Sequence, residues 1–370
     1  MATIREASFA DYGQIEALKA RHHLSGYTEA RWRHIYENNP LLNRRCLPWP
    51  IGWVIETGDK KIVGHLGNTP LEYEFNGKPL VAAAASLWAV DEAYRSQSLE
   101  LVGRFFRQQH VDLLLDTTAV PLAARVLEKL GMKRPPVPAY DRTAFWVLDH
   151  ERFLSSLLAK KRITAPGILT RPLAGLMIVA EKITGKCRLV STAGGPVEFC
   201  ARFDERFDRF WEDLRSRREG LLCVRDRKNL DWRFQEALAN GAAWVLATGD
   251  ETSLRAYAVC LRQDSPDIGL KRMRLADFQC AEGHLDALAA ILSAVLARCR
   301  SEGVHMLEVI GFGAEKKARL EALAPYRRQL PGWMFLYKTP DASLAKELEN
   351  PPVWDPCTYD GDGWLAQIKL

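Results

Sequence analysis

The stretch LVAAAASLWAVDEAYRSQSL, residues 80–99, decides how this chain of 370 residues is interpreted. Residues 80–90 are apolar and mostly small, which is typical of a buried strand. A charged segment at 91–95 follows, and residues 98–109 carry apolar side chains at helical spacing. The stretch therefore predicts a buried central strand, a short polar loop and a helix that begins at this loop.

Turn signals on both sides extend this unit. Upstream, two hairpins are predicted, one around residues 57–60 and one at Asn76-Gly77. Before them, Ser8 and Asp11 have the spacing of a helix capping box. Downstream, a short strand, a helix and a last strand are predicted at 111–115, 121–130 and 145–148.

The second part of the chain repeats this pattern in weaker form. Residues 244–250 (WVLATGD) resemble residues 53–59 (WVIETGD), and a helix predicted at 283–301 leads into a strand at 304–310. A repeat of this length indicates a duplicated domain. We expect an α/β fold of mixed sheets in two tandem domains. The expected ranges are 1–150 for the first domain, 151–197 for a connector, 198–340 for the second domain and 341–370 for an extended tail.

Composition excludes several classes of protein. Apolar residues make up 47% and charged residues 26%, as in ordinary soluble domains. The net charge of +5 suits an anionic ligand and gives nucleic-acid binding little support. The eight cysteines form no CxxC pair, so we expect free thiols and no metal site. We expect a cytoplasmic protein without a membrane span; for the basic and apolar connector, packing is favoured over membrane-surface binding.

Three segments, in order, resemble the GNAT N-acyltransferase superfamily over roughly residues 3–148. They are Ile4-Arg5-Glu6-Ala7 with Asp11, then Ala89-Val90-Asp91-Glu92-Ala93-Tyr94-Arg95, then Leu127-Glu128-Lys129-Leu130-Gly131-Met132-Lys133. The resemblance implies a GNAT-like fold in each half and transfer of an acyl group from a thioester to an amine. Acyl-CoA or acetyl-CoA is the implied co-substrate, and an acyl-carrier protein is a second candidate donor.

The resemblance also implies a cofactor site at the loop after the central strand. The implied contact residues are Val90, Arg95, Ser96, Gln97, Ser98, Leu99 and Thr117. The family loop has the pattern R-x-x-G-x-G or A, whose glycines let backbone N–H groups approach a pyrophosphate. Here Ser98 and Glu100 stand at the glycine positions. Ser98 is expected to cap the helix, whereas Glu100 would repel a phosphate if it faced inward.

The candidate catalytic residues come from both halves. Asp116 is the candidate general base, since the family's central strands separate near this position. Leu127 stands where many relatives have a tyrosine acid, which leaves Tyr94 and Tyr140 as candidates. In the second half, Asp277 and Glu308 interrupt apolar strand patterns and are candidate amine-binding groups. For each of these residues an ordinary structural role is the alternative.

Other acidic and polar residues receive structural interpretations. Glu72 and Glu74 are expected to face solvent, and His65 is expected to be a structural histidine. The segment Asp360-Gly361-Asp362-Gly363 resembles a calcium loop but lacks its downstream glutamate, so we expect a tail packed through its tryptophans.

The leading hypothesis is an N-acyltransferase acting on an amino sugar, an amino acid or a peptide. The alternative is a non-catalytic GNAT-like binding or scaffold protein, which the replaced tyrosine and glycines favour.

Overall fold

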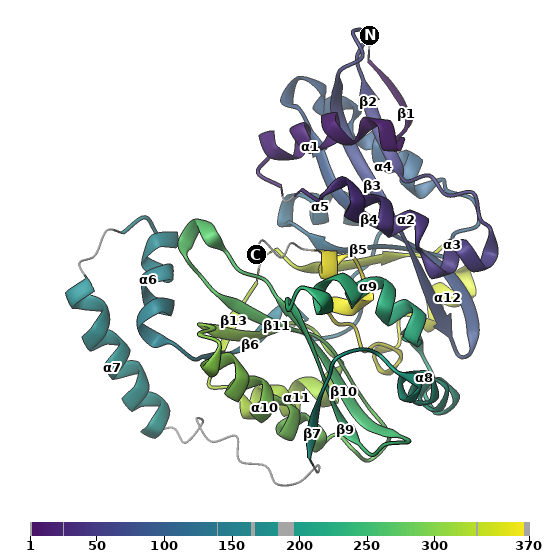
Figure 1. The fold of residues 1–370 in the computed structure, drawn as a ribbon. Coiled ribbons are helices and arrows are strands. Elements are labelled where there is room, and N and C mark those ends of the chain that lie inside the picture. Colours follow the sequence, from purple (N-terminus) through teal and green to yellow (C-terminus); the bar gives the residue numbers. More distant parts are fainter. Residues whose placement is uncertain are drawn as a thin grey trace.

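The computed structural model describes residues 2–24, 26–138, 140–163, 167–183, 196–330 and 332–365. Its strands form two mixed sheets of seven strands each, with helices packed against them (Figure 1). The expected α/β architecture with two sheets is therefore confirmed. Parts of the expected connector (164–166 and 184–195, including Cys187) and the end of the tail (366–370) lie outside the described residues.

The first sheet has the order β1-β2-β3-β4-β5-β14, and β8 pairs with β3. Its strands are β1 (Thr3–Glu6), β2 (Gly52–Glu56), β3 (Ile62–Phe75), β4 (Lys78–Val90), β5 (Leu113–Ala119), β8 (Leu221–Cys223) and β14 (Met334–Lys338). The helices near it in sequence are α1 (Tyr12–Arg21), α2 (Glu29–Glu37), α3 (Pro40–Arg45), α4 (Ser98–Phe106) and α5 (Pro121–Lys129).

The second sheet has the order β13-β6-β12-β11-β10-β9-β7. Its strands are β6 (Arg142–Val147), β7 (Val197–Cys200), β9 (Ala243–Gly249), β10 (Leu254–Arg262), β11 (Arg272–Cys280), β12 (Met306–Val309) and β13 (Tyr326–Gln329). The helices around it are α8 (Glu205–Arg217), α9 (Arg227–Ala239), α10 (Ala287–Ser301), α11 (Ala314–Leu323) and α12 (Ala342–Glu347). A hairpin of α6 (His150–Lys160) and α7 (Gly167–Ile183) lies between the two halves in sequence.

The turns and helix ends that depend only on neighbouring residues are present where the sequence predicts them. Ser8 and Asp11 make the capping box. Asn76 and Gly77 have φ values of 50° and 76°, the left-handed pair that a two-residue hairpin turn requires. Gly131, with φ of 91°, follows the end of α5. These residues fix the hairpins and helix ends of the first half.

The last strand of each half lies in the sheet of the other half. β6 pairs with β12 and β13 in the second sheet, and β14 pairs with β5 in the first. The expectation that residues 145–148 close the first sheet is therefore wrong, since a strand pattern records burial and not the partner strand. The predicted residue ranges of the two domains stay a prediction. β6 belongs to the first range but lies in the second sheet, and β14 belongs to the second range but lies in the first sheet.

The expectation that Glu72 and Glu74 face solvent is wrong. β3 is one strand of 14 residues, and both carboxylates on it are buried. Arg44 donates to Glu72 at 2.9 Å and Arg215 donates to Glu74 at 2.5 Å. Arginines from outside the strand thus compensate the cost of burial, which a pattern of alternating residues does not reveal.

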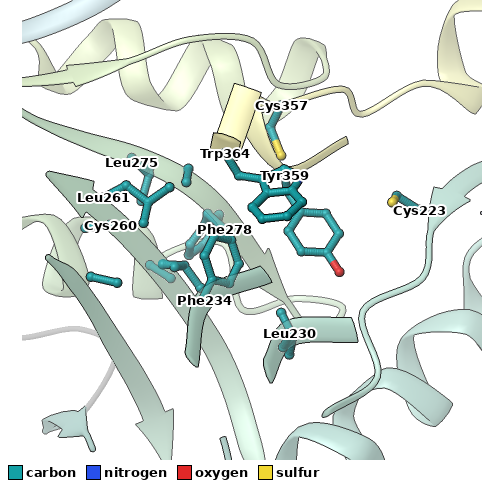
Figure 2. Close-up of a cluster of buried hydrophobic side chains, with 14 of the residues drawn as sticks. Cys223, Leu230, Phe234, Cys260, Leu261, Leu275, Phe278, Cys357, Tyr359 and Trp364 are labelled. Carbon is teal, nitrogen blue, oxygen red and sulfur yellow. The ribbon is translucent and has the colours of Figure 1, made fainter. Parts of the chain in front are cut away.

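Residues 354–365 of the tail are buried. Tyr359 and Trp364 are at most 3% exposed and pack against Phe234 and Trp232 of α9 (Figure 2). This agrees with the expected packing through tryptophan. Asp360 and Asp362 both have protein partners, so neither is arranged as a calcium ligand. The seven cysteines among the described residues are free.

Candidate functional site

The central strands of the first sheet separate in the middle of β4. β4 and β5 pair in parallel at three positions, the last being Ala84 with Leu115. Beyond them, Leu87 has φ of 51° and the register against β3 shifts between Ser86 and Ala89. A left-handed leucine is strained, and such strain is concentrated at functional sites. The separation leaves an edge of β4 backbone that can hydrogen-bond an extended ligand.

The imidazole of His65 holds this irregular segment. Its Nδ1 lies 3.2 Å from the carbonyl oxygen of Leu87. Burial lowers the pKa of His65 to about 3, with the charge of Lys19 adding to the effect. A neutral imidazole that donates to Leu87 fits the expected structural role.

The loop after β4 leads directly into α4. Residues Glu92–Gln97 form a 3-10 turn and Ser98 is the first residue of α4. Gln97 is the N-cap and makes no side-chain cap, so the expected capping by Ser98 is wrong. The 3-10 turn runs directly into α4, and the N–H of Ser98 donates to the carbonyl oxygen of Arg95, so backbone of the turn takes the place of a side-chain cap.

Charges around this turn suit an anion. The Arg95 side chain is 68% exposed and has only a 3.5 Å contact with Glu92. Glu100 pairs with Arg104 one turn later, at 3.9 Å. The carboxylate of Glu100 is therefore drawn along the helix and away from the loop.

A carboxyl group of β5 and one of the tail lie at the same part of β5. Asp116 is buried and accepts from the Thr118 N–H at 3.3 Å. Asp362 of the tail accepts from the hydroxyl of Thr117 at 2.8 Å and from that of Thr118 at 3.1 Å. Burial raises the pKa of Asp116 to about 8, and the charge of Asp362 adds to this rise. Burial also raises the pKa of Asp362 to about 6, against the two hydroxyls.

In this Asp116–Asp362 pair both pKa values are therefore raised toward neutrality. Carboxyl groups with raised pKa values can serve as proton acceptors or donors in acid–base chemistry.

Tyr140 lies near the pair, whereas Tyr94 belongs to the loop. Tyr140 is buried and feels the charges of Asp360, Asp362 and Arg274, and burial raises its pKa well above the ordinary value. Tyr94 is partly buried against the core of the first half. The charge of Asp362 thus reaches Tyr140, the hydroxyl of Thr117 is bound to Asp362, and Tyr94 is next to Arg95 in the chain. Val90 ends β4 just before the loop.

Asp277 and Glu308 lie in networks of buried arginines. Arg225 donates to Asp277 at 3.0 Å, and Tyr257 donates to it at 3.0 Å as well. Arg274 donates to Glu308 at 2.7 Å, and Arg328 contacts the other oxygen. The two carboxylates have no exposed surface. Their geometry is that of charged anchors and gives no support to amine binding.

The second half has a large cavity of about 810 Å³ at the outer end of its own separating strands. It is lined by residues after β11, by the starts of α10 and α11, and by the tail. Glu282, Asp286 and Glu315 lie on its wall, and no ion pair is formed by them within the described residues. Arg218 and Lys316 on the same wall are both paired with Asp355, at 3.0 and 2.5 Å.

The sequence marks neither Asp362 as a partner of Asp116 nor the carboxylates of the cavity wall as a group. Asp362 lies 246 positions after Asp116, and no local pattern links them. The one available signal was a pair of aspartates between glycines in an otherwise aromatic tail.

Solved structures similar to this chain come from acyltransferases. No protein-family model matches the sequence, and no curated protein matches it. N-myristoyltransferase of Saccharomyces cerevisiae with bound myristoyl-CoA is 12% identical, with 91% of this chain and 78% of that chain covered and a TM-score of 0.56. A GCN5-related N-acetyltransferase from Anabaena variabilis is 12% identical, with 92% and 73% covered and a TM-score of 0.52.

A putative acetyltransferase from Pyrococcus horikoshii is 12% identical, with 97% of this chain and 95% of that chain covered and a TM-score of 0.51. These likenesses extend over nearly the whole chain, and they confirm the tandem GNAT-like fold that the sequence predicts.

Proposed function

We propose that this protein is an N-acyltransferase that takes an acyl group from a CoA thioester bound in its first half. The observation that carries the proposal is the gap between β4 and β5, with left-handed Leu87 on one strand and the Asp116–Asp362 pair on the other. The similarity to acyltransferase structures, one of them with myristoyl-CoA bound, supports it.

The donor would lie along the free edge of β4 with its phosphates at the start of α4. The exposed guanidinium of Arg95 would supply charge-assisted hydrogen bonds to the phosphates. A CoA pantetheine arm is long and amide-bearing, so an unpaired strand edge offers it matching donors and acceptors.

In the proposed reaction, Asp116 and Asp362 would carry out the two proton transfers that acyl transfer to an amine requires. The amine nitrogen attacks the thioester carbonyl, a C–N bond forms and the C–S bond breaks. One proton leaves the nitrogen and one proton reaches the departing sulfur. The carboxylate of Asp362 would accept the first and the carboxyl group of Asp116, with the higher pKa, would donate the second, so no separate tyrosine acid is needed at Leu127.

The acceptor would enter from the second half. The cavity of about 810 Å³ has three carboxylates without ion partners on its wall, Glu282, Asp286 and Glu315. A second, smaller cavity shares Arg218, Trp354 and Asp355 with it and extends to Tyr73 and Asp360. Negative charge in the larger cavity favours a cationic amine, such as an amino sugar, an amino acid or the end of a peptide.

A thermal-shift titration with CoA, acetyl-CoA and a long-chain acyl-CoA tests the donor. A ligand of the folded state raises stability by about 2.7 kcal/mol at a hundredfold excess over its Kd. We expect a shift that is lost in Arg95→Ala and kept in Arg107→Ala, which removes an exposed cation at the C-terminal end of α4. A shift only with an acyl-carrier thioester would move the donor to a carrier protein. No shift with any thioester would favour the non-catalytic scaffold.

A further inference from the structure

The hairpin of α6 and α7 carries an apolar face that the rest of the described chain does not cover. It projects from the body beside β6 and β13 (Figure 1). Its inner side is held by Phe153 and Met177, which pack against the cluster around Phe145 and Met306. Buried Ala174 and Thr170 also lie on α7. The hairpin is thus attached along one side and open on the other.

The open side of α7 is a stripe of large aliphatic side chains. Leu173, Leu176, Val179 and Ile183 are 49%, 66%, 52% and 80% exposed. Their spacing of three, three and four residues places them on one face of a helix. Water-exposed stripes of this kind are uncommon on soluble domains and mark interaction surfaces.

Positive charge flanks this stripe. Residues 150–183 contain six basic residues and two acidic ones, a balance of +4. The two acids, Glu151 and Glu181, are paired with Arg171 and His150 inside the hairpin.

The free positive charge lies at both ends of α7. Lys160, Lys161 and Arg162 lie together at the end of α6, ahead of α7 in the chain, and Lys182 lies near the end of α7. All four are exposed, and within the described residues no ion pair is formed by them. An aliphatic stripe with cations at both ends matches the interface of an anionic bilayer, where acyl chains meet negative headgroups.

We propose that the hairpin docks the protein onto the surface of an anionic lipid bilayer, with the α7 stripe inserted and the basic residues on the headgroups. No helix of the described residues is long and apolar enough to cross a membrane, so α7 would lie in the interface. The proposal is independent of acyl transfer, since none of these residues borders the β4–β5 gap.

Cosedimentation of the full chain with vesicles tests the docking. One set contains phosphatidylcholine alone, and the other has about one third phosphatidylglycerol. We expect binding to the anionic set only, weakened by salt. Charge reversal at Lys160, Lys161 and Arg162 to Glu should lower the partition coefficient about 100-fold. The double change Leu176→Asp with Val179→Asp should lower it at least about tenfold.

Matched variants separate docking from general charge and folding effects. Lys228→Glu with Lys346→Glu removes exposed cations elsewhere, and Leu122→Asp removes an apolar side chain that is 75% exposed on α5. These variants should bind vesicles more like the wild type than the hairpin variants do, and all should keep the wild-type circular dichroism spectrum. Equal binding by every variant, or no vesicle binding together with a dimer that Leu176→Asp dissociates, would overturn the proposal.

Discussion

In both halves the two central parallel strands separate after a short paired stretch. The gap that this leaves between the strands is filled differently in the two halves. In the first half, β4 and β5 part after Ala84 and Leu115, and the tail reaches only the β5 side of the gap at Thr117 and Thr118. In the second half, β11 and β12 part after Leu275 and Val309. There the tail residue Cys357 contacts both Gly311 and Asp277.

The contents of the second gap are structural. Arg225 bonds to Asp277 on β11 and to Asp360 on the tail, and its guanidinium lies 4.4 Å from the ring centre of Tyr359. The tail thus closes one gap with buried ion pairs and supplies a titratable carboxyl group to the other. The comparison teaches that the same separation of strands can stay open in one half and be closed by the tail in the other.

Asp116→Asn tests the chemistry of the open gap and should have the largest effect. Because Asn keeps the acceptor for the Thr118 N–H but cannot take a proton, we expect kcat to fall about 10³-fold with little change in KM. Steady-state kinetics with the best thioester and amine measures this. Asp362→Asn should behave alike, and wild-type kcat in both variants would contradict a catalytic pair.

Arg225→Met tests the closed gap, where the expected loss is in stability. Removing the cation leaves Asp277 and Asp360 buried without it, which should lower the free energy of unfolding by about 3–5 kcal/mol. Chemical denaturation followed by tryptophan fluorescence gives the value. Arg33→Met, whose partners Glu29 and Glu37 are exposed, is the matched control and should change stability within error. Equal losses in both variants would argue against a buried anchor.

The raised pKa of Asp116 makes the stability of the open gap depend on pH. Asp116 has a pKa of about 8 in the folded state, against an ordinary value of about 3.9. The folded state therefore binds more protons than the unfolded state between these values, and stability falls as the pH rises. Relative to Asp116→Asn, the wild type should lose up to about 1.4 kcal/mol per pH unit between about pH 5 and 8. Parallel unfolding curves across this range would refute the raised pKa.

Arg95→Ala tests the anion-binding end of the open gap and should have the smallest effect. The loss of one charge-assisted contact to a phosphate should raise the Kd for CoA about tenfold. Isothermal titration calorimetry measures this, with Arg107→Ala, at the C-terminal end of the same helix, as the control of equal charge. A Kd that both substitutions leave unchanged would place the phosphates elsewhere.

The sequence predicts what neighbouring residues determine. The capping box at Ser8, the turn at Asn76-Gly77 and the stop at Gly131 depend on local φ and hydrogen bonding, and all three are present. The order of strands and helices in the first half follows from the same local signals, and so does the likeness to the GNAT fold.

The sequence pattern does not predict contacts between segments that are far apart in the chain. The exchange of β6 and β14 between sheets depends on which strand edge each one meets, and Glu74 is buried only because Arg215 covers it. Asp116 could be proposed from its place at the end of a strand. Its partner Asp362 could not, because the tail returns to β5 only in the folded chain.

Hydrogen–deuterium exchange with and without a long-chain acyl-CoA tests the difference between the halves most directly. The account predicts slower exchange of amides in residues 85–99, where β4 and the start of α4 would hold the donor, and unchanged exchange in residues 276–287. Protection confined to residues 276–287, with residues 85–99 unaffected, would contradict it and assign the donor to the second half.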